Sequence, residues 1–240
     1  MNEDRLYRMI EEKEGMVSLA FPALMRKVYV WMTLALIITG FTAFGIASNP
    51  GIAYAIVTNS VLFWGLIIAE FGLVIAINGA INKLSITTAT LLFVLYSVVN
   101  GATLSVIFLA YTLTSIASVF FITAGTFAVM AFIGYTTKKD LTGLGSMLFI
   151  GLIGIVIATI VNIFLGSSML SMIISYVGVA VFVGLTAYDS QKIKNMLYEA
   201  DSMDEGAQKI ALLGSLSLYL DFINLFLMLL RIFGGNRDWE

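Results

Sequence analysis

Three ionisable residues, Glu70, Asp221 and Arg231, lie inside long apolar stretches of this 240-residue chain, and a fourth, Asp189, lies at the end of one. Burying an unpaired charge in hydrocarbon costs at least about 2.5 to 3.5 kcal/mol, so ionisable residues within membrane spans are candidates for function. Two carboxyl groups that face each other in a low-dielectric site cannot both ionise cheaply, and such a pair can share one proton. When both groups ionise, their oxygens suit a hard cation such as Ca²⁺. Asp189 and Asp221 are therefore the predicted proton switch and transient metal ligands.

Each of these residues also has a structural interpretation. Asp189 precedes Lys192 by three residues and could lie at the level of the lipid headgroups. Arg231 could extend its guanidinium group to water near the end of its helix. Glu70 could be tied to a neighbouring backbone or hydroxyl group. Asp221 is the hardest of the four to explain by structure alone, because it lies in the middle of its apolar stretch.

The composition indicates a membrane protein, since 60% of the residues are apolar and only 12% are charged, against about 25% charged in a soluble domain. Spanning about 30 Å of hydrocarbon takes roughly 20 helical residues, and seven apolar runs are long enough. The runs are continuous and contain many glycines, which favours packed helices over an alternating membrane barrel. The predicted spans are Val28–Ala47, Ala53–Ile77, Ile86–Tyr111, Ile116–Tyr135, Met147–Leu165, Leu170–Tyr188 and Ile210–Phe233.

Several classes of chemistry are excluded by the residue types. The chain has no cysteine and no histidine, so it has no disulfide framework, no thiol nucleophile and no imidazole or thiolate metal ligand. The formal charge of −2 and the lack of a basic stripe exclude a nucleic-acid footprint. We therefore expect no cofactor and no enzymatic activity.

The last span carries a polar stripe. At about 100° per residue, one sector of this helix holds Gly214, Ser217, Asp221, Asn224 and Arg231, while large apolar residues cover the rest. Lipid cannot solvate such a stripe, so it should face the protein interior, and the last helix should lie at the centre of the bundle. In an antiparallel hairpin with its tip at Glu205, Asp189 lies 16 residues before the tip and Asp221 lies 16 after it, so the two carboxyl groups should sit level.

The chain divides into a charged N-terminal segment (1–27), a seven-helix domain (28–233) and a short tail (234–240). Lysine and arginine precede the first span and recur in every second connection, which predicts a cytoplasmic N-terminus. This alternation would place the C-terminal tail on the other side. Arg231 and Arg237 fit that placement poorly, so a re-entrant seventh segment stays open as an alternative.

Two segments carry a family resemblance: residues 186–193 (TAYDSQKI) and residues 216–226 (LSLYLDFINLF). They resemble the signature segments of the Bax-inhibitor family, while residues 69–73 and 230–234 are similar to its second-span glutamate and closing segments. The resemblance implies a seven-helix fold whose last helix is enclosed by the other six. It also implies a pH-sensitive calcium leak gated by an aspartate dyad, here Asp189 and Asp221. Ser190 stands where the family usually has threonine, and Lys83 is the candidate for a basic residue that pairs with the dyad in some relatives.

The sequence therefore predicts a closed state in which the singly protonated Asp189 and Asp221 hydrogen-bond across the sixth and seventh helices. Glu70, Asn224, Arg231 and Lys83 are the other residues predicted along the cation path or at the gate. The predicted partners are the lipid bilayer, calcium ions, protons and another membrane protein, and the predicted location is a bacterial inner membrane.

Two other functions stay open from the sequence alone. Some bacterial members of the resembled family are associated with a membrane protease, and the family name comes from suppression of cell death. A non-conducting scaffold or regulator of other membrane proteins is therefore the first alternative. An intramembrane aspartyl protease is the second, although Leu218, Tyr219 and Leu220 stand where those proteases have a Gly-x-Gly motif before the aspartate.

Overall fold

The computed structural model describes residues 3–200 and 203–235, with side chains of the first helix described from Ala20 onward, and this part of the chain folds into helices without a strand. Within the described residues, seven segments are long and apolar enough to cross a membrane, which confirms the predicted all-α class of seven spans. The helices are α1 (Glu3–Ala47), α2 (Pro50–Thr58), α3 (Ser60–Ala80), α4 (Ile86–Leu104), α5 (Ile107–Ala110), α6 (Leu113–Thr136), α7 (Thr142–Leu165), α8 (Ser168–Tyr198) and α9 (Glu205–Phe233).

Short polar residues set where the spans begin. Ser85, Thr112, Ser167 and Asp204 each accept a hydrogen bond from the backbone amide three residues later, at the starts of α4, α6, α8 and α9. Such caps satisfy backbone amides that have no partner within the helix. Gly166 ends α7 with a φ of 60°, a left-handed conformation that glycine adopts without steric cost. These residues therefore define the boundaries of the long helices.

Three boundaries differ from the predicted spans by seven residues or more. The second span begins at Ser60, because Asn59 has an extended backbone and caps α3 with its side chain, leaving α2 as a separate short helix. The first span begins at Ala20, inside a helix that continues without a break from Glu3. The sixth continues ten residues beyond the predicted Tyr188 end, to Tyr198. Apolar runs indicate where a helix can be buried in lipid, but caps decide where the helix stops.

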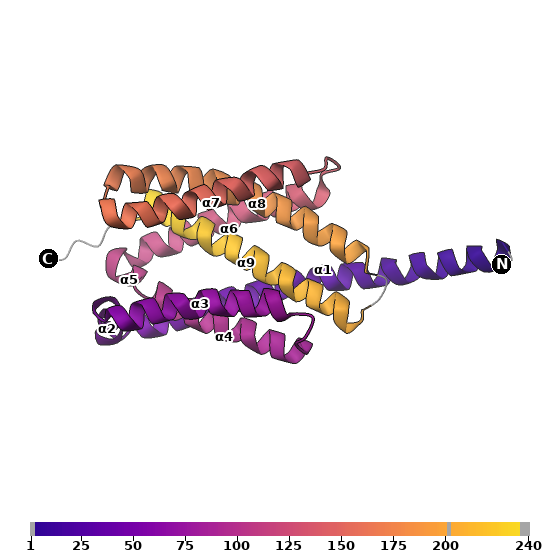
Figure 1. The fold of residues 1–240 in the computed structure, drawn as a ribbon, viewed down its shortest axis with the longest axis horizontal. Helices are drawn as coiled ribbons and strands as arrows, with labels where there is room; N and C mark the ends of the chain where they lie inside the picture. Colours follow the sequence, from indigo (N-terminus) through magenta and orange to yellow (C-terminus); the bar gives the residue numbers. More distant parts are fainter. Residues whose placement is uncertain (1–2, 201–202, 236–240) are drawn as a thin grey trace.

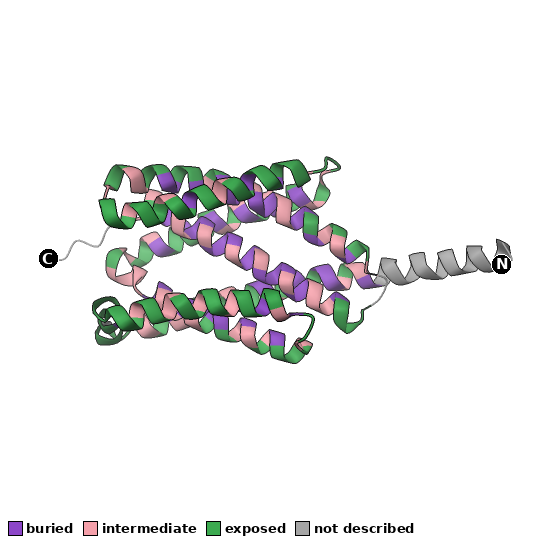
Figure 2. Ribbon diagram, in the orientation of Figure 1, coloured by how far each residue is buried: buried purple, intermediate pink, exposed green. Residues whose placement is uncertain are grey.

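Helix α9 runs obliquely between two groups of helices, with α6, α7 and α8 on one side and α1 to α4 on the other (Figure 1). It packs mainly against α8, α1 and α6, and less extensively against α4. The most hydrophobic part of α9 is 67% buried, whereas no other span exceeds 39%, and Figure 2 shows buried residues along its whole length. The last helix is thus the most buried span among the described residues, and its main neighbours are four helices. The predicted enclosure by all six other spans is not confirmed by these contacts.

The connections that carry basic residues share one end of the bundle. The α3–α4 turn, the α6–α7 loop and the α8–α9 connection lie at the end from which the first half of α1 projects (Figure 1). Helix α9 is continuous from Glu205 to Phe233 and ends at the opposite side, so the described structure has no re-entrant seventh segment. Arg237 lies outside the described residues.

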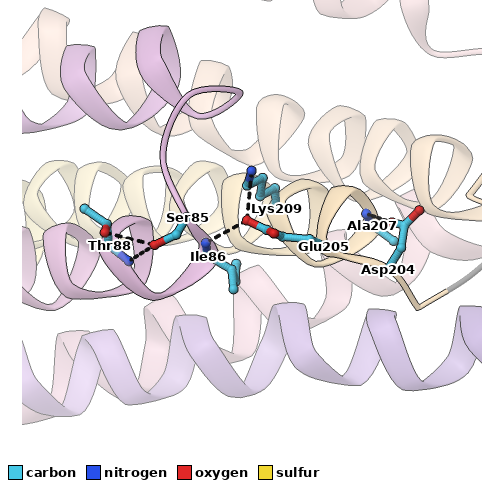
Figure 3. A network of polar contacts seen from close by, with 7 residues as sticks. All are labelled: Ser85, Ile86, Thr88, Asp204, Glu205, Ala207 and Lys209. Carbon is cyan, nitrogen blue, oxygen red and sulfur yellow. Dashed lines mark hydrogen bonds and ion pairs between the residues drawn. The ribbon is translucent and has the colours of Figure 1, made fainter.

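The first turn of α9 is anchored to the first turn of α4 (Figure 3). The Glu205 carboxylate accepts a hydrogen bond from the Ile86 amide at 3.1 Å and forms an ion pair with Lys209 at 3.0 Å. Asp204 caps the same turn by accepting from the Ala207 amide at 2.8 Å. These contacts fix the start of the helix that carries Asp221 to a helix more than 100 residues earlier in the chain.

Candidate functional site

Asp189 of α8 and Asp221 of α9 lie on facing helices. Ser217, one turn before Asp221 on α9, donates a hydrogen bond from Oγ to Asp189 Oδ2 at 2.7 Å. The carboxyl groups of Asp189 and Asp221 are close enough to interact electrostatically, and the Lys192 ammonium group interacts in the same way with Asp189. The structure therefore brings the two predicted carboxyl groups together and adds a hydroxyl group between their helices.

Asp221 is the less satisfied member of the pair. Its side chain is only 6% exposed, and no hydrogen-bond donor among the described residues reaches its Oδ2 atom. Buried polar atoms are hydrogen-bonded in the great majority of cases, and an unpartnered one calls for an explanation. Ser190 Oγ, next to Asp189 in the chain, is buried, and its polar neighbour is the Tyr29 hydroxyl group of α1. Asp221 thus carries the unsatisfied oxygen atom of the carboxyl pair.

The register of the two helices differs from the prediction. Equal spacing from Glu205 predicts that Asp189 and Asp221 sit level, whereas the hydrogen bond places Asp189 level with Ser217, one turn nearer the tip. The reason is that the connection is not helical throughout: α8 ends at Tyr198 and α9 begins at Glu205. The predicted direct hydrogen bond between the two carboxyl groups is absent from the described contacts, and Ser217 takes its place at Asp189.

Close helix packing positions the segment that carries Asp189. Any Cβ atom on Gly134 of α6 would overlap the backbone carbonyl group of Ala187, and one on Gly145 of α7 would overlap the Tyr188 ring. Both glycines therefore allow α6 and α7 to approach α8 immediately before Asp189. Gln191, two residues after Asp189, holds the α6–α7 loop: its side chain accepts from the Leu141 amide at 2.9 Å and donates to the Lys139 carbonyl oxygen at 2.8 Å.

Glu70 lies on α3, away from the carboxyl pair and on the other side of α9. The polar neighbours of its carboxyl group are Asn100 and Thr103 of α4. The same carboxyl group interacts electrostatically with the hydroxyl groups of Tyr96 and Tyr219. Its Oε1 atom is buried without a hydrogen-bond partner among the described residues. Glu70 therefore belongs to a second buried polar region.

That second region centres on Tyr219, which the sequence analysis did not single out. Tyr219 is fully buried, and its hydroxyl group donates to Asn100 Oδ1 at 3.0 Å and contacts Thr39 Oγ1 at 2.6 Å. Thr39 in turn donates to the Ser97 carbonyl oxygen at 2.9 Å. The network joins α9 to α1 and α4 through uncharged groups. A search for charged residues in apolar runs does not detect such groups.

The hydrogens of this network can be counted. Tyr219 and Thr39 carry one hydroxyl hydrogen each, whereas the contacts of Tyr219 with Asn100, of Tyr219 with Thr39, and of Thr39 with Ser97 need three. With Oδ1 of Asn100 toward Tyr219, one contact lacks a hydrogen. With the amide reversed, its NH₂ group supplies the third and its carbonyl oxygen is free for another donor.

Three other predicted residues lie apart from the pair. Arg231 is exposed in the last turn of α9, ten residues and about 15 Å along the helix from Asp221. Lys83 is exposed in the α3–α4 turn. Asn224 lies one turn beyond Asp221 but donates to the Leu220 carbonyl oxygen of its own helix at 2.8 Å.

The fold and the site define a polytopic all-α membrane protein with a buried carboxyl pair between its last two spans. The family model described as "Inhibitor of apoptosis-promoting Bax1" matches residues 22–238. The chain belongs to this Bax-inhibitor family, as its two signature-like segments indicate.

Named relatives cover nearly the whole chain. It is 53% identical to "Inner membrane protein YbhL" of Escherichia coli (strain K12), over 89% of this chain and 92% of that protein. It is 48% identical to an uncharacterized protein of Borreliella burgdorferi, over 95% of this chain and 97% of that protein. It is 44% identical to "Uncharacterized protein RP147" of Rickettsia prowazekii, over 89% and 90%.

Proposed function

We propose that this protein is a pH-sensitive calcium leak of a bacterial inner membrane, gated by Asp189 and Asp221. The observation that carries the proposal is the Asp221 carboxyl group, which is buried beside a second carboxyl group and has an oxygen atom without a hydrogen-bond donor among the described residues. A purely structural residue at this position would cost stability without a compensating bond. Such a group is suited to gain and lose a proton.

The gate works through charge. In the closed state the pair holds one proton, and the hydrogen bond from Ser217 keeps Asp189 against α9. Loss of that proton leaves two negative charges in a low-dielectric contact, and their repulsion drives α8 and α9 apart. Lys192 is the charged neighbour on α8 that offsets part of the repulsion at Asp189. The released carboxylate oxygens then form a passing site for the cation.

Calcium is the transported ion in this proposal and not a resident one. Ca²⁺ takes six to eight oxygen ligands, and the described residues hold no cluster of three or more acidic or other metal-binding side chains. Two carboxylates with nearby hydroxyl groups suit weak, transient binding, which passage through a pore requires. Asn224 continues the path one turn beyond Asp221, and exposed Arg231 acts as a counter-charge at the far end of α9.

Glu70 and Lys83 have lesser parts in the proposal. The contacts of Glu70 with α4 favour a role in holding the Tyr219 side of α9 over a place in the cation path. Lys83, exposed in a turn, contributes to the positive charge at one end of the bundle. That end is the cytoplasmic one by the charge rule for membrane loops. The inner-membrane location rests on the similarity to "Inner membrane protein YbhL" of Escherichia coli.

The test is Ca²⁺ flux into liposomes that contain the purified protein, from about pH 6 to about pH 8, across which a coupled carboxyl pair can titrate. The wild type is compared with Asp189→Asn and Asp221→Asn, and Asp140→Asn in an exposed loop is the matched control. We expect a pH-dependent flux that either dyad variant alters and the control does not. An unaltered flux in Asp221→Asn contradicts the gate.

Absence of flux above empty liposomes at every pH contradicts the channel itself. The non-conducting scaffold or regulator is then favoured, and copurification of another membrane protein becomes the next measurement. The aspartyl protease has less support, because bulky buried residues, Leu218 and Tyr219, precede Asp221 in place of glycines.

A further inference from the structure

A groove opens between α1 and α6 on the outside of the bundle, separate from the α8–α9 contact that holds the carboxyl pair. Its volume is about 680 Å³, in the range of small-molecule sites. Its floor includes Phe222 of α9, and its walls are formed almost entirely by apolar side chains. Large residues among them are Met25, Met32, Leu36, Phe120, Phe127 and Phe132.

The groove lies at membrane depth. Its lining residues run from Pro22 to Leu36 on α1 and from Phe120 to Tyr135 on α6, all within membrane-spanning segments. At a helical rise of about 1.5 Å per residue, each wall is roughly 20 Å long, somewhat more than the depth of one leaflet of hydrocarbon. An extended acyl chain of one leaflet fits this length and polarity.

One end of the groove is basic. Arg26 lines it, is exposed, and has no carboxylate partner among the described residues. Tyr135 lines the same end, and Lys194 lies beside it, with Nζ donating to the Tyr135 carbonyl oxygen at 2.9 Å and sitting 5.3 Å from the ring centroid. Two cations therefore flank the end of the groove where a lipid headgroup would lie.

We propose that this groove binds an anionic phospholipid, with the phosphate group at Arg26 and Lys194 and one acyl chain along the α1–α6 walls. Basic pockets between spans bind anionic headgroups, and long basic side chains reach the headgroup level from within a span. The basic end and the apolar lining along the rest of the groove favour a lipid, because its headgroup supplies an anion and its acyl chain is apolar throughout.

The experiment measures lipid retention by the full-length protein in detergent, by native mass spectrometry, with added phosphatidylglycerol or phosphatidylcholine. Arg26→Gln removes the headgroup contact, and Lys27→Gln is its matched control, because the neighbouring Lys27 binds Gln208 of α9 instead. Ala128→Phe fills the groove, and Val129→Phe is its control, because Val129 is 58% exposed and is not part of the lining.

We expect phosphatidylglycerol to be retained over phosphatidylcholine, and Arg26→Gln to weaken its binding about fivefold, the loss expected for one basic residue at a membrane surface. Ala128→Phe should displace the lipid, while both controls bind like the wild type. Equal retention of the two lipids, or unchanged binding in Arg26→Gln and Ala128→Phe, overturns the proposal. Copurification of a protein instead of a lipid, lost in Ala128→Phe, overturns it in favour of a helix partner.

Discussion

The two sides of α9 handle buried polar groups differently. Tyr219 and Asp221 are two residues apart and, at about 100° per residue, point to nearly opposite sides of the helix. The Tyr219 hydroxyl group is hydrogen-bonded to both α1 and α4. Asp221 faces another carboxyl group, and its Oδ2 atom has no donor among the described residues.

The comparison separates a fixed contact from one that can switch. The Tyr219 hydroxyl group joins α9 to α1 and α4 by side-chain hydrogen bonds, although Glu70 Oε1 in the same region has no donor among the described residues. Asp221 makes no described side-chain hydrogen bond to α8, so a proton gained or lost there can change that contact. We therefore expect α9 to stay with α1 and α4 and to move relative to α8.

Tyr219→Phe should have the largest effect on stability. It removes the hydroxyl group that joins α9 to Asn100 and Thr39, and leaving a buried partner unsatisfied costs about 1 to 3 kcal/mol. Thermal unfolding in detergent measures the loss. Tyr54→Phe, at a position 60% exposed, is the control and should unfold like the wild type. Equal stability of the two variants would contradict the conclusion that the Tyr219 hydroxyl group holds α9 to α1 and α4.

Ser217→Ala should have a smaller effect. It removes the hydrogen bond to Asp189 Oδ2, for which a net loss of about 1 kcal/mol is expected. The same variant should also shift the pH dependence of Ca²⁺ flux, because Asp189 loses its hydrogen bond to α9. Ser146→Ala, at an exposed position of α7 whose hydroxyl group donates to the Thr142 carbonyl oxygen of its own helix, controls for loss of a serine hydroxyl group. A flux profile identical to that of the wild type would exclude Ser217 from the gate.

Asp221→Asn should leave the free energy of unfolding unchanged to within about 0.5 kcal/mol, or raise it slightly. No described hydrogen bond is lost, and a buried group that can ionise is replaced by a neutral one of similar shape. The free energies of unfolding of Asp221→Asn and Tyr219→Phe, measured under the same conditions, compare the two sides of α9 directly. A loss as large as that of Tyr219→Phe would indicate that Asp221 holds the fold together and would break the distinction.

Asp140 should give the smallest effect. The Thr142 hydroxyl and amide groups donate hydrogen bonds to its carboxylate and hold its pKa below the ordinary value of 3.8. The folded pKa is thus lower than the unfolded one, so its contribution is complete above the unfolded pKa and is lost as pH falls through the folded pKa. The protection factor of the Thr142 amide, which is its exchange rate relative to an unstructured amide at the same pH, should therefore be constant near neutral pH and smaller in Asp140→Asn. A protection factor that changes with pH near neutrality would contradict this assignment.

Much of the fold could be predicted from the sequence, because lipid makes length and apolar composition decisive. The seven spans and the buried positions of Gly214 and Asp221 could be predicted from apolar runs and a 100° periodicity. The rest of the predicted polar stripe is less buried: Ser217 and Asn224 are half-buried and Arg231 is exposed. The separate helix α2 could not be predicted in this way, because it depends on the extended backbone of one residue, Asn59. Caps are local and weak signals beside a long apolar run.

The candidate site could be predicted only in part. Buried charges led to Asp189 and Asp221, but their relative height depends on where α8 ends, which spacing alone does not determine. Tyr219, Asn100 and Thr39 were missed because they are uncharged, and only three-dimensional packing shows that their side chains form one hydrogen-bonded network. The placement of Glu70 on the Tyr219 side likewise depends on the packing of α3 against α4.

The most direct test of the account is a pair of distances measured by electron spin resonance in lipid nanodiscs, above and below neutral pH. Because the chain has no cysteine, spin labels can be placed at Met169 and Phe233 for α8–α9, and at Phe41 and Phe233 for α1–α9, all exposed positions. We predict that the α8–α9 distance grows as pH rises while the α1–α9 distance stays constant, and that Asp221→Asn abolishes the change. An α8–α9 distance that is independent of pH in the wild type would contradict it.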